Sequence, residues 1–327
     1  MTGQVVRHAA VVIGRNEGER LKRCLRGLSA AELVVYVDSG STDGSAEAAA
    51  STGAEVIKLD LTLPFTAARA RNAGLARVCE LRPDIPFVQF VDGDCELAAD
   101  WVACAMEFLD KHERVAAVAG RRRERNPSYS VYNLLCDWEW DGPVGLVRSI
   151  GGDAMMRKSA IESVGGFRGD LIAGEEPELC VRLRSDGWQI WRLGNEMTLH
   201  DAAMSRFSQW WARSSRAGYA YANGAYLHGR LPERFNAWES RRAWLWGLCI
   251  PLVGVTAVLL FGWHGLTFFL IYPAQMLRQF VRTGGTFHRR AILAVFQILA
   301  RFPEMIGQVK FFIDLIARRK PKLIEYK

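Results

Sequence analysis

Short apolar runs and amphipathic stretches alternate along the first 92 residues of the chain. Each apolar run is too short for a helix, and the stretches between them place apolar residues at helical spacing. Strands that alternate with helices in this way predict an α/β fold with a mainly parallel sheet. The predicted strands are Ala9–Gly14, Leu33–Asp38, Ala54–Leu59 and Phe87–Asp92, and the predicted helices are Leu21–Leu28, an alanine-rich helix stopping at Gly53, and Ala67–Leu81.

The pattern changes beyond about residue 240. Ala243–Phe261 is nearly all apolar, and about 20 such residues cross a bilayer as a helix. His264–Leu277 is shorter and contains Pro273, which fits either a hairpin return or a re-entrant segment. Ala291–Ile316 is amphipathic and is predicted to lie in the membrane interface. The alternative for these segments is a buried helical domain.

Charge follows this division of the chain. The net charge is +7, and residues 278–327 contain 11 Lys and Arg against three acids, so the basicity belongs to the C-terminal end. Arg241 and Arg242 precede the apolar segments and four arginines follow them, as expected for a hairpin with both ends at the cytoplasmic face of a membrane. Anionic lipids would attract this end further. Nucleic acid is not an expected partner, because the basic residues adjoin apolar helices.

Cysteine usage and the N-terminal sequence bear on the compartment. The seven cysteines are odd in number and form no Cys-x-x-Cys pair, which fits a reducing cytoplasm. The first strand begins within ten residues, without a charged and then apolar leader, so no signal peptide is expected. We therefore predict a domain at residues 1–235 that faces the cytoplasm and a membrane-associated helical region at residues 236–327.

Two carboxylates end the predicted strand Phe87–Asp92, in the segment Asp92-Gly93-Asp94. Open parallel sheets bind ligands at the carboxyl ends of their strands. Two acids at that edge predict an oxygen-ligand site for Mg²⁺ or Mn²⁺ that bridges to phosphate oxygens. The alternative is an ordinary acidic turn.

Five segments, taken together and in order, resemble the family 2 inverting glycosyltransferases of the GT-A fold. The resemblance covers roughly residues 5–225 and implies an enzyme that uses a nucleotide-sugar donor and a divalent metal. The segments are Val12–Glu17 (Val-Ile-Gly-Arg-Asn-Glu), Val37–Ser45, Ala70–Gly74 (Ala-Arg-Asn-Ala-Gly), Asp92–Asp94 and Gly174–Arg182.

For the donor, the resemblance implies nucleotide contacts by Ile13, Arg15, Glu17 and Asp38. Asp38 ends a predicted buried strand, and the aligned acid of similar enzymes contacts the nucleobase. Glu17 has the alternative role of an acid that starts a helix. Arg71 offers a planar set of donors suited to phosphate or a sugar hydroxyl, or else is a solvated residue of its helix.

For the metal, the resemblance implies that Asp94 is a direct ligand and that Asp92 faces the ribose or a metal-bound water. His200 occupies the place where many similar enzymes have a histidine near the metal or the diphosphate; its alternative is a structural histidine. Asp153 stands where the family often has a polar residue near the transferred sugar.

The acidic segment Glu175-Glu176-Pro177-Glu178 contains the candidate catalytic base, Glu176, with Glu175 beside it. The family usually has aspartate at the position of Glu176. Glutamate has the same carboxylate on a longer arm and can still accept a proton from an acceptor hydroxyl. The alternative is that these acids only start a helix.

Trp138 and Trp140 alternate with acids and are candidates to stack on the acceptor sugar, or else belong to the core. The membrane region implies a lipid-linked or polysaccharide acceptor, and the segment Gln209–Ser214 lacks the final tryptophan of processive synthases, so addition of single sugars is expected. Two alternatives remain. One is a catalytically silent membrane scaffold with the same fold. The other is a sugar nucleotidyltransferase, which would need a glycine-rich phosphate loop with a lysine after the first strand.

Overall fold

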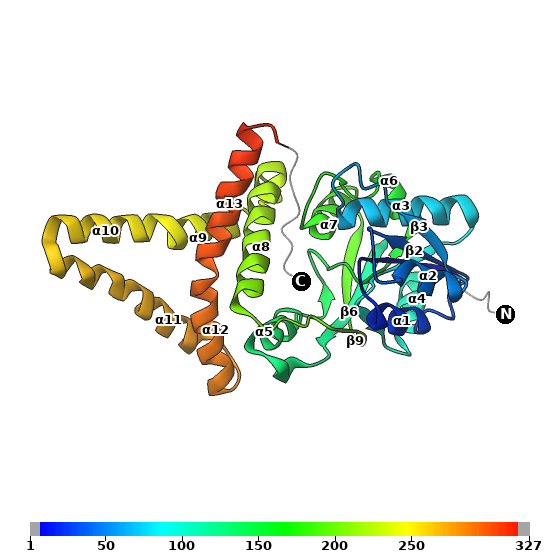
Figure 1. Cartoon of the computed structure of the whole chain (residues 1–327), viewed down its shortest axis with the longest axis horizontal. Helices are drawn as coiled ribbons and strands as arrows, with labels where there is room; N and C mark the ends of the chain where they lie inside the picture. Colours follow the sequence, from blue (N-terminus) through cyan, green and yellow to red (C-terminus); the bar gives the residue numbers. More distant parts are fainter. Residues whose placement is uncertain (1–6, 320–327) are drawn as a thin grey trace. The chain divides into compact units, whose positions relative to one another are not determined.

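The computed structural model describes residues 7–319. These residues form two compact units, one extending to Ser205 and the other beginning at Arg206 (Figure 1). The first unit contains the sheet, and the second is helical. The sequence predicted that the catalytic domain ends at residue 235, and this functional boundary stays a prediction. By packing, the helix α8 (Phe207–His228) belongs to the second unit.

The described part of the first unit contains a nine-stranded sheet with the order β3-β2-β1-β4-β8-β6-β9-β5, and β7 pairs with β9. Strands β1, β2, β3 and β4 are parallel, as are β6 and β9, whereas β8 runs antiparallel to both β4 and β6. The predicted mainly parallel α/β sheet is therefore confirmed. The strands are β1 (His8–Gly14), β2 (Leu33–Asp38), β3 (Glu55–Lys58), β4 (Phe87–Asp92), β5 (Cys95–Leu97), β6 (Val115–Glu124), β7 (Gly145–Leu146), β8 (Ala154–Arg157) and β9 (Gln189–His200).

Helices cover both faces of the sheet (Figure 1). The central strand β1 is accordingly apolar on both sides, and its residues 9–12 are fully buried. These helices are α1 (Glu19–Arg26), α2 (Ser45–Ser51), α3 (Ala67–Leu81), α4 (Trp101–Lys111), α5 (Val131–Glu139), α6 (Lys158–Ser163) and α7 (Glu175–Ser185), with a 3₁₀ turn, η1, at Pro127–Tyr129.

The packing of α3 on β1 explains why the Ala-Arg-Asn-Ala-Gly segment ends in a glycine, Gly74. A Cβ atom added to Gly74 would lie 2.3 Å from Cγ1 of Val11 on β1, so only glycine lets α3 approach the sheet this closely. Arg71 lies about one turn earlier on the same helix. The close packing of α3 thus places the Arg71 side chain at the carboxyl edge of the sheet.

In the second unit, α8 packs tightly on α13 (Arg301–Ile316). A Cβ atom on Gly218 would lie 1.9 Å from the Glu304 carbonyl oxygen, and one on Gly307 would lie 1.9 Å from the Ser215 carbonyl oxygen. Both contacts are backbone contacts, which side-chain rotation cannot relieve.

Gly307→Ala is therefore expected to force the two helices apart and destabilise the second unit, by about 1–3 kcal/mol, the usual cost of overpacking. Thermal unfolding of the detergent-purified protein measures the effect. Gly284→Ala is the matched control, because a Cβ atom on Gly284 meets nothing within 4 Å. Equal unfolding temperatures for the two variants would contradict the close helix contact.

The apolar segments fold back on themselves as an antiparallel hairpin. The chain turns at Gly262, where φ is 60°. A Cβ atom on Gly265 would lie 2.4 Å from the backbone of Ala257, and the Tyr272 hydroxyl donates a 2.7 Å hydrogen bond to the Trp246 carbonyl oxygen. The second segment therefore runs back along the first, and its path through a membrane, as a hairpin return or a re-entrant segment, stays a prediction.

We call residues 245–277 the apolar hairpin (Figure 1). Its outward side chains are exposed and apolar along both arms. By length and composition, two helical stretches, Ala237–Arg282 and Phe287–Ile316, are long and apolar enough to cross a membrane. The elements are α9 (Ala237–Trp244), a π-helical turn η2 (Leu245–Cys249), α10 (Ile250–Phe261), a 3₁₀ helix η3 (Gly262–Leu270), α11 (Ile271–Arg282) and α12 (Phe287–Leu299).

Candidate active site

The carboxyl ends of β1, β2 and β4 lie side by side and bring the predicted donor-site residues to one edge of the sheet. In the strand register Gly14 pairs with Asp38, and Ile13 pairs with Asp92. Gly93 donates its backbone N–H to the Ile13 carbonyl oxygen at 2.8 Å. The Asp92-Gly93-Asp94 turn is thereby tied to the end of the central strand, which is the edge where parallel sheets bind ligands.

Asp92 lies between two guanidinium groups. Its Oδ1 is 2.9 Å from Nη2 of Arg71, and its Oδ2 is 3.6 Å from Nη2 of Arg122. Its backbone N–H donates to Oδ1 of Asp153 at 3.0 Å. Arginine carries its charge throughout the physiological range, so the two cations compensate the acidic cluster.

Asp153 lies behind Asp92 rather than at the surface of the site. Its residue is 1% exposed, and its second oxygen accepts a 2.9 Å hydrogen bond from the Thr198 hydroxyl. This arrangement fixes the direction of the Asp92 backbone. A direct contact between Asp153 and a donor sugar stays a prediction.

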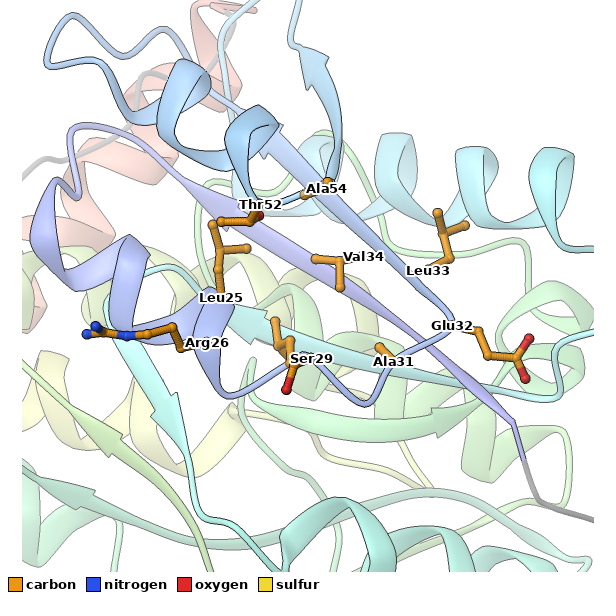
Figure 2. Close-up of a pocket in the computed structure, with 11 residues that line it drawn as sticks. Leu25, Arg26, Ser29, Ala31, Glu32, Leu33, Val34, Thr52 and Ala54 are labelled. Atoms are coloured by element: carbon orange, nitrogen blue, oxygen red, sulfur yellow. The ribbon is translucent and has the colours of Figure 1, made fainter.

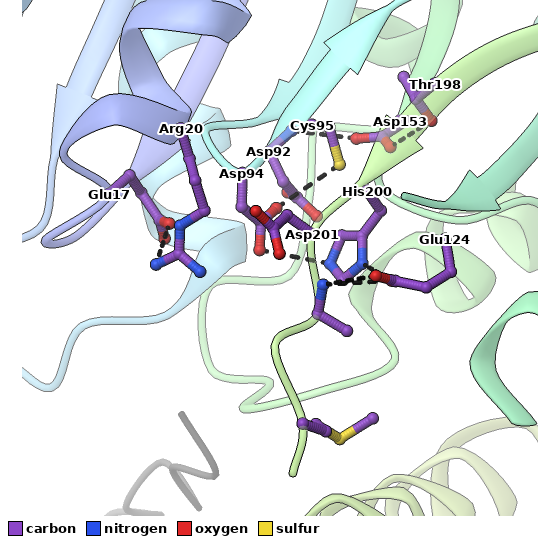
Figure 3. A network of polar contacts seen from close by, with 12 residues as sticks. Glu17, Arg20, Asp92, Asp94, Cys95, Glu124, Asp153, Thr198, His200 and Asp201 are labelled. Atoms are coloured by element: carbon purple, nitrogen blue, oxygen red, sulfur yellow. Dashed lines mark hydrogen bonds and ion pairs between the residues drawn. The ribbon is translucent and has the colours of Figure 1, made fainter. Parts of the chain in front are cut away.

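Asp94 and His200 come together across neighbouring strands (Figure 3). Nε2 of His200 lies 3.3 Å from Oδ2 of Asp94, and Nδ1 lies 3.1 Å from Oε2 of Glu124. Strand pairing explains the proximity, because His200 at the end of β9 is the register partner of both Cys95 on β5 and Glu124 on β6. The resemblance to similar enzymes placed His200 near Asp94, and the structure brings the two side chains into contact.

The donor atoms of this group fit a divalent cation. One ligand atom each from Asp94, Cys95 and His200 lies within 4.8 Å of the others. Burial raises the pKa of the Cys95 thiol, which makes it the weakest donor of the three. Burial and the Arg122 guanidinium lower the pKa of His200, which favours the neutral imidazole that metal binding requires. A carboxylate with an imidazole suits Mn²⁺ better than Mg²⁺, which favours oxygen ligands.

The candidate base is held by the arginine that also contacts Asp92. Nη1 of Arg71 lies 2.8 Å from Oε1 of Glu176 and 2.9 Å from Oε1 of Glu175. Both acids lie in the first turn of α7. The Glu176 side chain is 13% exposed and that of Glu175 is 4% exposed, so Glu176 is the more accessible of the two.

The environment of Glu176 tunes its proton affinity. Burial and the neighbouring Glu175 carboxylate raise the pKa of Glu176 to about 7, and the Arg71 guanidinium offsets part of that increase. A carboxylate with a pKa near neutrality is suited to general-base catalysis, because about half of it is ionised at neutral pH and it is basic enough to accept a proton.

The predicted nucleotide-contact residues lie around the loops that follow β1 and β2. The buried Asp38 carboxylate accepts hydrogen bonds from the Gly40 and Ser41 backbone N–H groups at 3.1 and 3.0 Å and so organises its loop. Glu17 pairs with Arg20 at 2.8 Å, and the Arg15 guanidinium lies 4.8 Å from the centre of the Phe65 ring. Their contacts with a nucleotide stay predictions.

Of the two candidate tryptophans, the structure places Trp140 at the site. Its ring meets the His200 ring edge-on, with 4.8 Å between centroids, and the Arg122 guanidinium lies 4.7 Å from its centre. Trp138 is the next-to-last residue of α5, whose C-terminal cap is Trp140. Stacking on an acceptor sugar stays a prediction for both residues.

Sequence reasoning missed two residues of this site, Arg122 and Glu124. Both lie at the carboxyl end of β6, in the segment Gly120-Arg121-Arg122-Arg123-Glu124 after a buried apolar strand. A charged run at the end of such a strand was the available signal. Their neighbours on β9 lie about 75 residues further along the chain, so spacing alone could not pair them.

A separate pocket of about 410 Å³ lies next to the amino end of β2, and residues including Leu25, Glu32, Val34 and Thr52 line it (Figure 2). It is at the opposite end of β2 from Asp38. The acids and the imidazole described above are not among its lining residues.

Residues 10–164 match the family model described as glycosyl transferase family 2, so the resemblance seen in the sequence is confirmed over this part of the chain. The match covers slightly less than half of the chain.

Two solved structures match the chain over most of its length. The mannosyltransferase PcManGT from Pyrobaculum calidifontis, solved in complex with GDP-Man and Mn²⁺, is 19% identical with a TM-score of 0.61, over 94% of this chain and 87% of that chain. TarS from S. aureus, residues 1–349, is 12% identical with a TM-score of 0.47, over 93% and 91%. The first similarity confirms the predicted GT-A fold. No curated protein sequence matches the chain significantly.

Proposed function

We propose that the protein is an inverting glycosyltransferase that moves a hexosyl group from a nucleotide-sugar to an acceptor hydroxyl at the cytoplasmic face of a membrane. One observation carries the proposal: a single buried guanidinium, that of Arg71, contacts both Asp92 of the acidic turn and Glu176. The candidate donor site and the candidate base are therefore side by side, as transfer between two bound substrates requires.

The donor diphosphate would lie at the carboxyl edge beside Asp92, Asp94 and His200. A divalent cation held there by Asp94 and His200 would neutralise the charge that develops on the leaving nucleoside diphosphate. PcManGT, with the similar fold, is described in complex with GDP-Man and Mn²⁺. Arg122 adds a fixed positive charge next to the same carboxylates and supports the binding of an anionic donor.

Glu176 would accept the proton of the acceptor hydroxyl while the hydroxyl oxygen attacks the anomeric carbon from the face opposite the diphosphate. Such an attack inverts the configuration, so an α-linked donor gives a β-linked product. Arg71 orients Glu176 through its 2.8 Å contact, and the pKa of about 7 leaves much of the carboxylate ionised at neutral pH.

The apolar hairpin supports a membrane location. Exposed apolar surfaces of this extent in a folded protein mark interaction sites. The arginines that flank the hairpin support attachment from the cytoplasmic side. A lipid-linked or polysaccharide acceptor follows from that location, and we place the activity in envelope polysaccharide or glycolipid assembly.

A silent scaffold with the same fold is the principal alternative, and a nucleotide-sugar hydrolysis assay separates it from an active enzyme. The acids Asp38, Asp94 and Glu176 and the neighbouring Arg71 are all present, which favours the enzyme. For the nucleotidyltransferase, the segment Arg15-Asn16-Glu17-Gly18 after β1 supplies no phosphate-binding lysine.

Calorimetric titration of the detergent-purified protein with UDP, GDP, CMP and dTDP, each with and without Mn²⁺, tests the proposal. We expect one nucleotide to bind in the presence of Mn²⁺. We expect this Mn²⁺-dependent binding to be lost in Asp94→Asn. Asp84→Asn is the control, because Asp84 precedes β4 at the opposite edge of the sheet. Failure of the folded protein to bind any nucleotide would exclude the transferase and favour the scaffold.

A further inference from the structure

Glu124 is a fully buried carboxylate next to the candidate metal group. It ends β6 opposite His200 on β9, and its side chain is 0% exposed. A buried carboxylate is costly unless hydrogen bonds satisfy its oxygens. The contacts of Glu124 therefore indicate what holds it there.

Three of these contacts come from groups that can only donate hydrogen bonds. The Ala202 backbone N–H lies 3.1 Å from Oε2, Nδ2 of Asn133 lies 3.2 Å from Oε1, and the Asn126 backbone N–H lies 3.4 Å from Oε1. Both oxygens of Glu124 thus act as acceptors. An ionised carboxylate has no hydrogen to donate, so in the fourth contact, at 3.1 Å, Nδ1 of His200 is the donor (Figure 3).

A proton held on Nδ1 leaves Nε2 as the nitrogen that can ligate a cation. Nε2 points at Oδ2 of Asp94, 3.3 Å away, and the edge-on contact with Trp140 restricts the tilt of the ring. Histidines that bind metals commonly donate their other N–H to a carboxylate, which fixes both tautomer and ring orientation.

We propose that Glu124 is a positioning residue: it holds the proton of His200 on Nδ1 and aims Nε2 at the cation beside Asp94. The inference rests on the proposed function, because it takes the Asp94–His200 pair as the cation site. Glu124 does not contact the cation or the substrates in this arrangement.

Glu124→Gln is the direct test. Glutamine keeps the shape of the side chain but replaces one acceptor oxygen with an N–H₂ group, which then faces the N–H donors that surround residue 124. The local contacts are then best satisfied when Nδ1 of His200 accepts from the amide and the proton moves to Nε2. We expect Mn²⁺ binding about 10- to 100-fold weaker than in the wild type, measured by calorimetry with Mn²⁺ alone and with Mn²⁺ plus inorganic pyrophosphate.

The matched control is Glu178→Gln. The Glu178 side chain is 1% exposed and is bonded to Arg182, so this variant also replaces a buried carboxylate with an amide. We expect its Mn²⁺ affinity to equal that of the wild type. Glu124→Asp, which keeps an acceptor-only group on a shorter arm, provides a second variant if Glu124→Gln does not fold, and its expected affinity is intermediate.

A second readout requires no metal. Nitrogen-15 NMR of the histidine rings in the metal-free wild type, assigned with His200→Asn, shows which ring nitrogen carries a proton. We expect a proton on Nδ1 of His200, and an unprotonated Nδ1 would overturn the inference. Equal Mn²⁺ affinity of the wild type and Glu124→Gln would overturn it as well. If the wild type itself fails to bind Mn²⁺, the cation part of the proposed function fails, and the inference fails with it.

Discussion

Glu176→Gln is expected to lower kcat for sugar transfer by about 10²–10⁴-fold, the usual contribution of a general base. Glutamine can still accept the hydrogen bond from Nη1 of Arg71, which Glu176 now accepts at 2.8 Å, so the local geometry is preserved. Nucleotide binding should change little. Steady-state kinetics together with nucleotide calorimetry on the same preparation separate the loss of the base from the loss of the donor site.

The pH dependence of the wild type provides an independent readout of the same base. Because Glu176 must be ionised to accept a proton and its pKa is raised to about 7, activity should rise through neutral pH. Below that pH, activity should fall about tenfold per unit as the fraction of ionised base falls. A profile that stays flat from pH 5 to pH 8 would contradict the assignment.

Stability should move in the opposite direction from activity. The pKa of Glu176 is higher in the folded chain than the ordinary glutamate value of 4.5, because of burial and Glu175, so the folded state binds this proton more tightly. The contribution of Glu176 to the free energy of unfolding therefore decreases as the pH rises from about 4.5 to about 7. Glu176→Gln removes this loss, and its unfolding temperature at pH 8 should be no lower than that of the wild type. Glu178→Gln serves as the control in both assays.

If Glu176→Gln retains nearly full activity, the proton goes elsewhere. Glu175 is the other carboxylate that contacts Arg71 Nη1, at 2.9 Å, and Glu175→Gln would then show the loss. That result would exchange the roles of the two residues and leave the rest of the site unchanged.

The fold was predictable to the extent that it depends on local periodicity. The strands ending at Asp38 and Asp92 and the helix Ala67–Leu81 appear with the predicted ends, because buried parallel strands are apolar runs and turn residues delimit them. The packing of α8 with α13 was not predictable. It depends on Gly218 and Gly307, which are far apart in sequence and carry no signal until the two helices are placed together.

The candidate site divides in a similar way. Asp92 and Asp94 lie at the end of a strand and Glu176 lies at the start of a helix, so their sequence context indicated their place. Arg122 and Glu124 depend on the pairing of β6 with β9, whose register contains irregularities. A shift by one residue turns a side chain to the other face of the sheet, so their contacts with Asp92 and His200 require the structure.

Lysines at two outward positions of the apolar hairpin are expected to release the protein from membranes. Leu252 and Val255 are 56% and 52% exposed and lie one turn apart in the middle of the first arm. A lysine near the middle of a bilayer costs about 2.5–3.5 kcal/mol on insertion scales, so two are expected to weaken partitioning by roughly 10³-fold or more. Co-sedimentation with vesicles that contain anionic lipid measures the change.

The control for this experiment carries the same charge outside the hairpin. Val144 and Leu146 are 66% and 64% exposed in the first unit, so Val144→Lys with Leu146→Lys adds two lysines at exposed apolar positions and should leave sedimentation unchanged. If the hairpin variant still sediments like the wild type, the hairpin does not hold the protein on the membrane, and the second apolar stretch, Phe287–Ile316, is the candidate anchor. If it is released but still hydrolyses the nucleotide-sugar, catalysis and membrane attachment belong to separate parts of the chain. Loss of transfer to a lipid-linked acceptor in that released protein would then mean that the hairpin brings the active site to its acceptor.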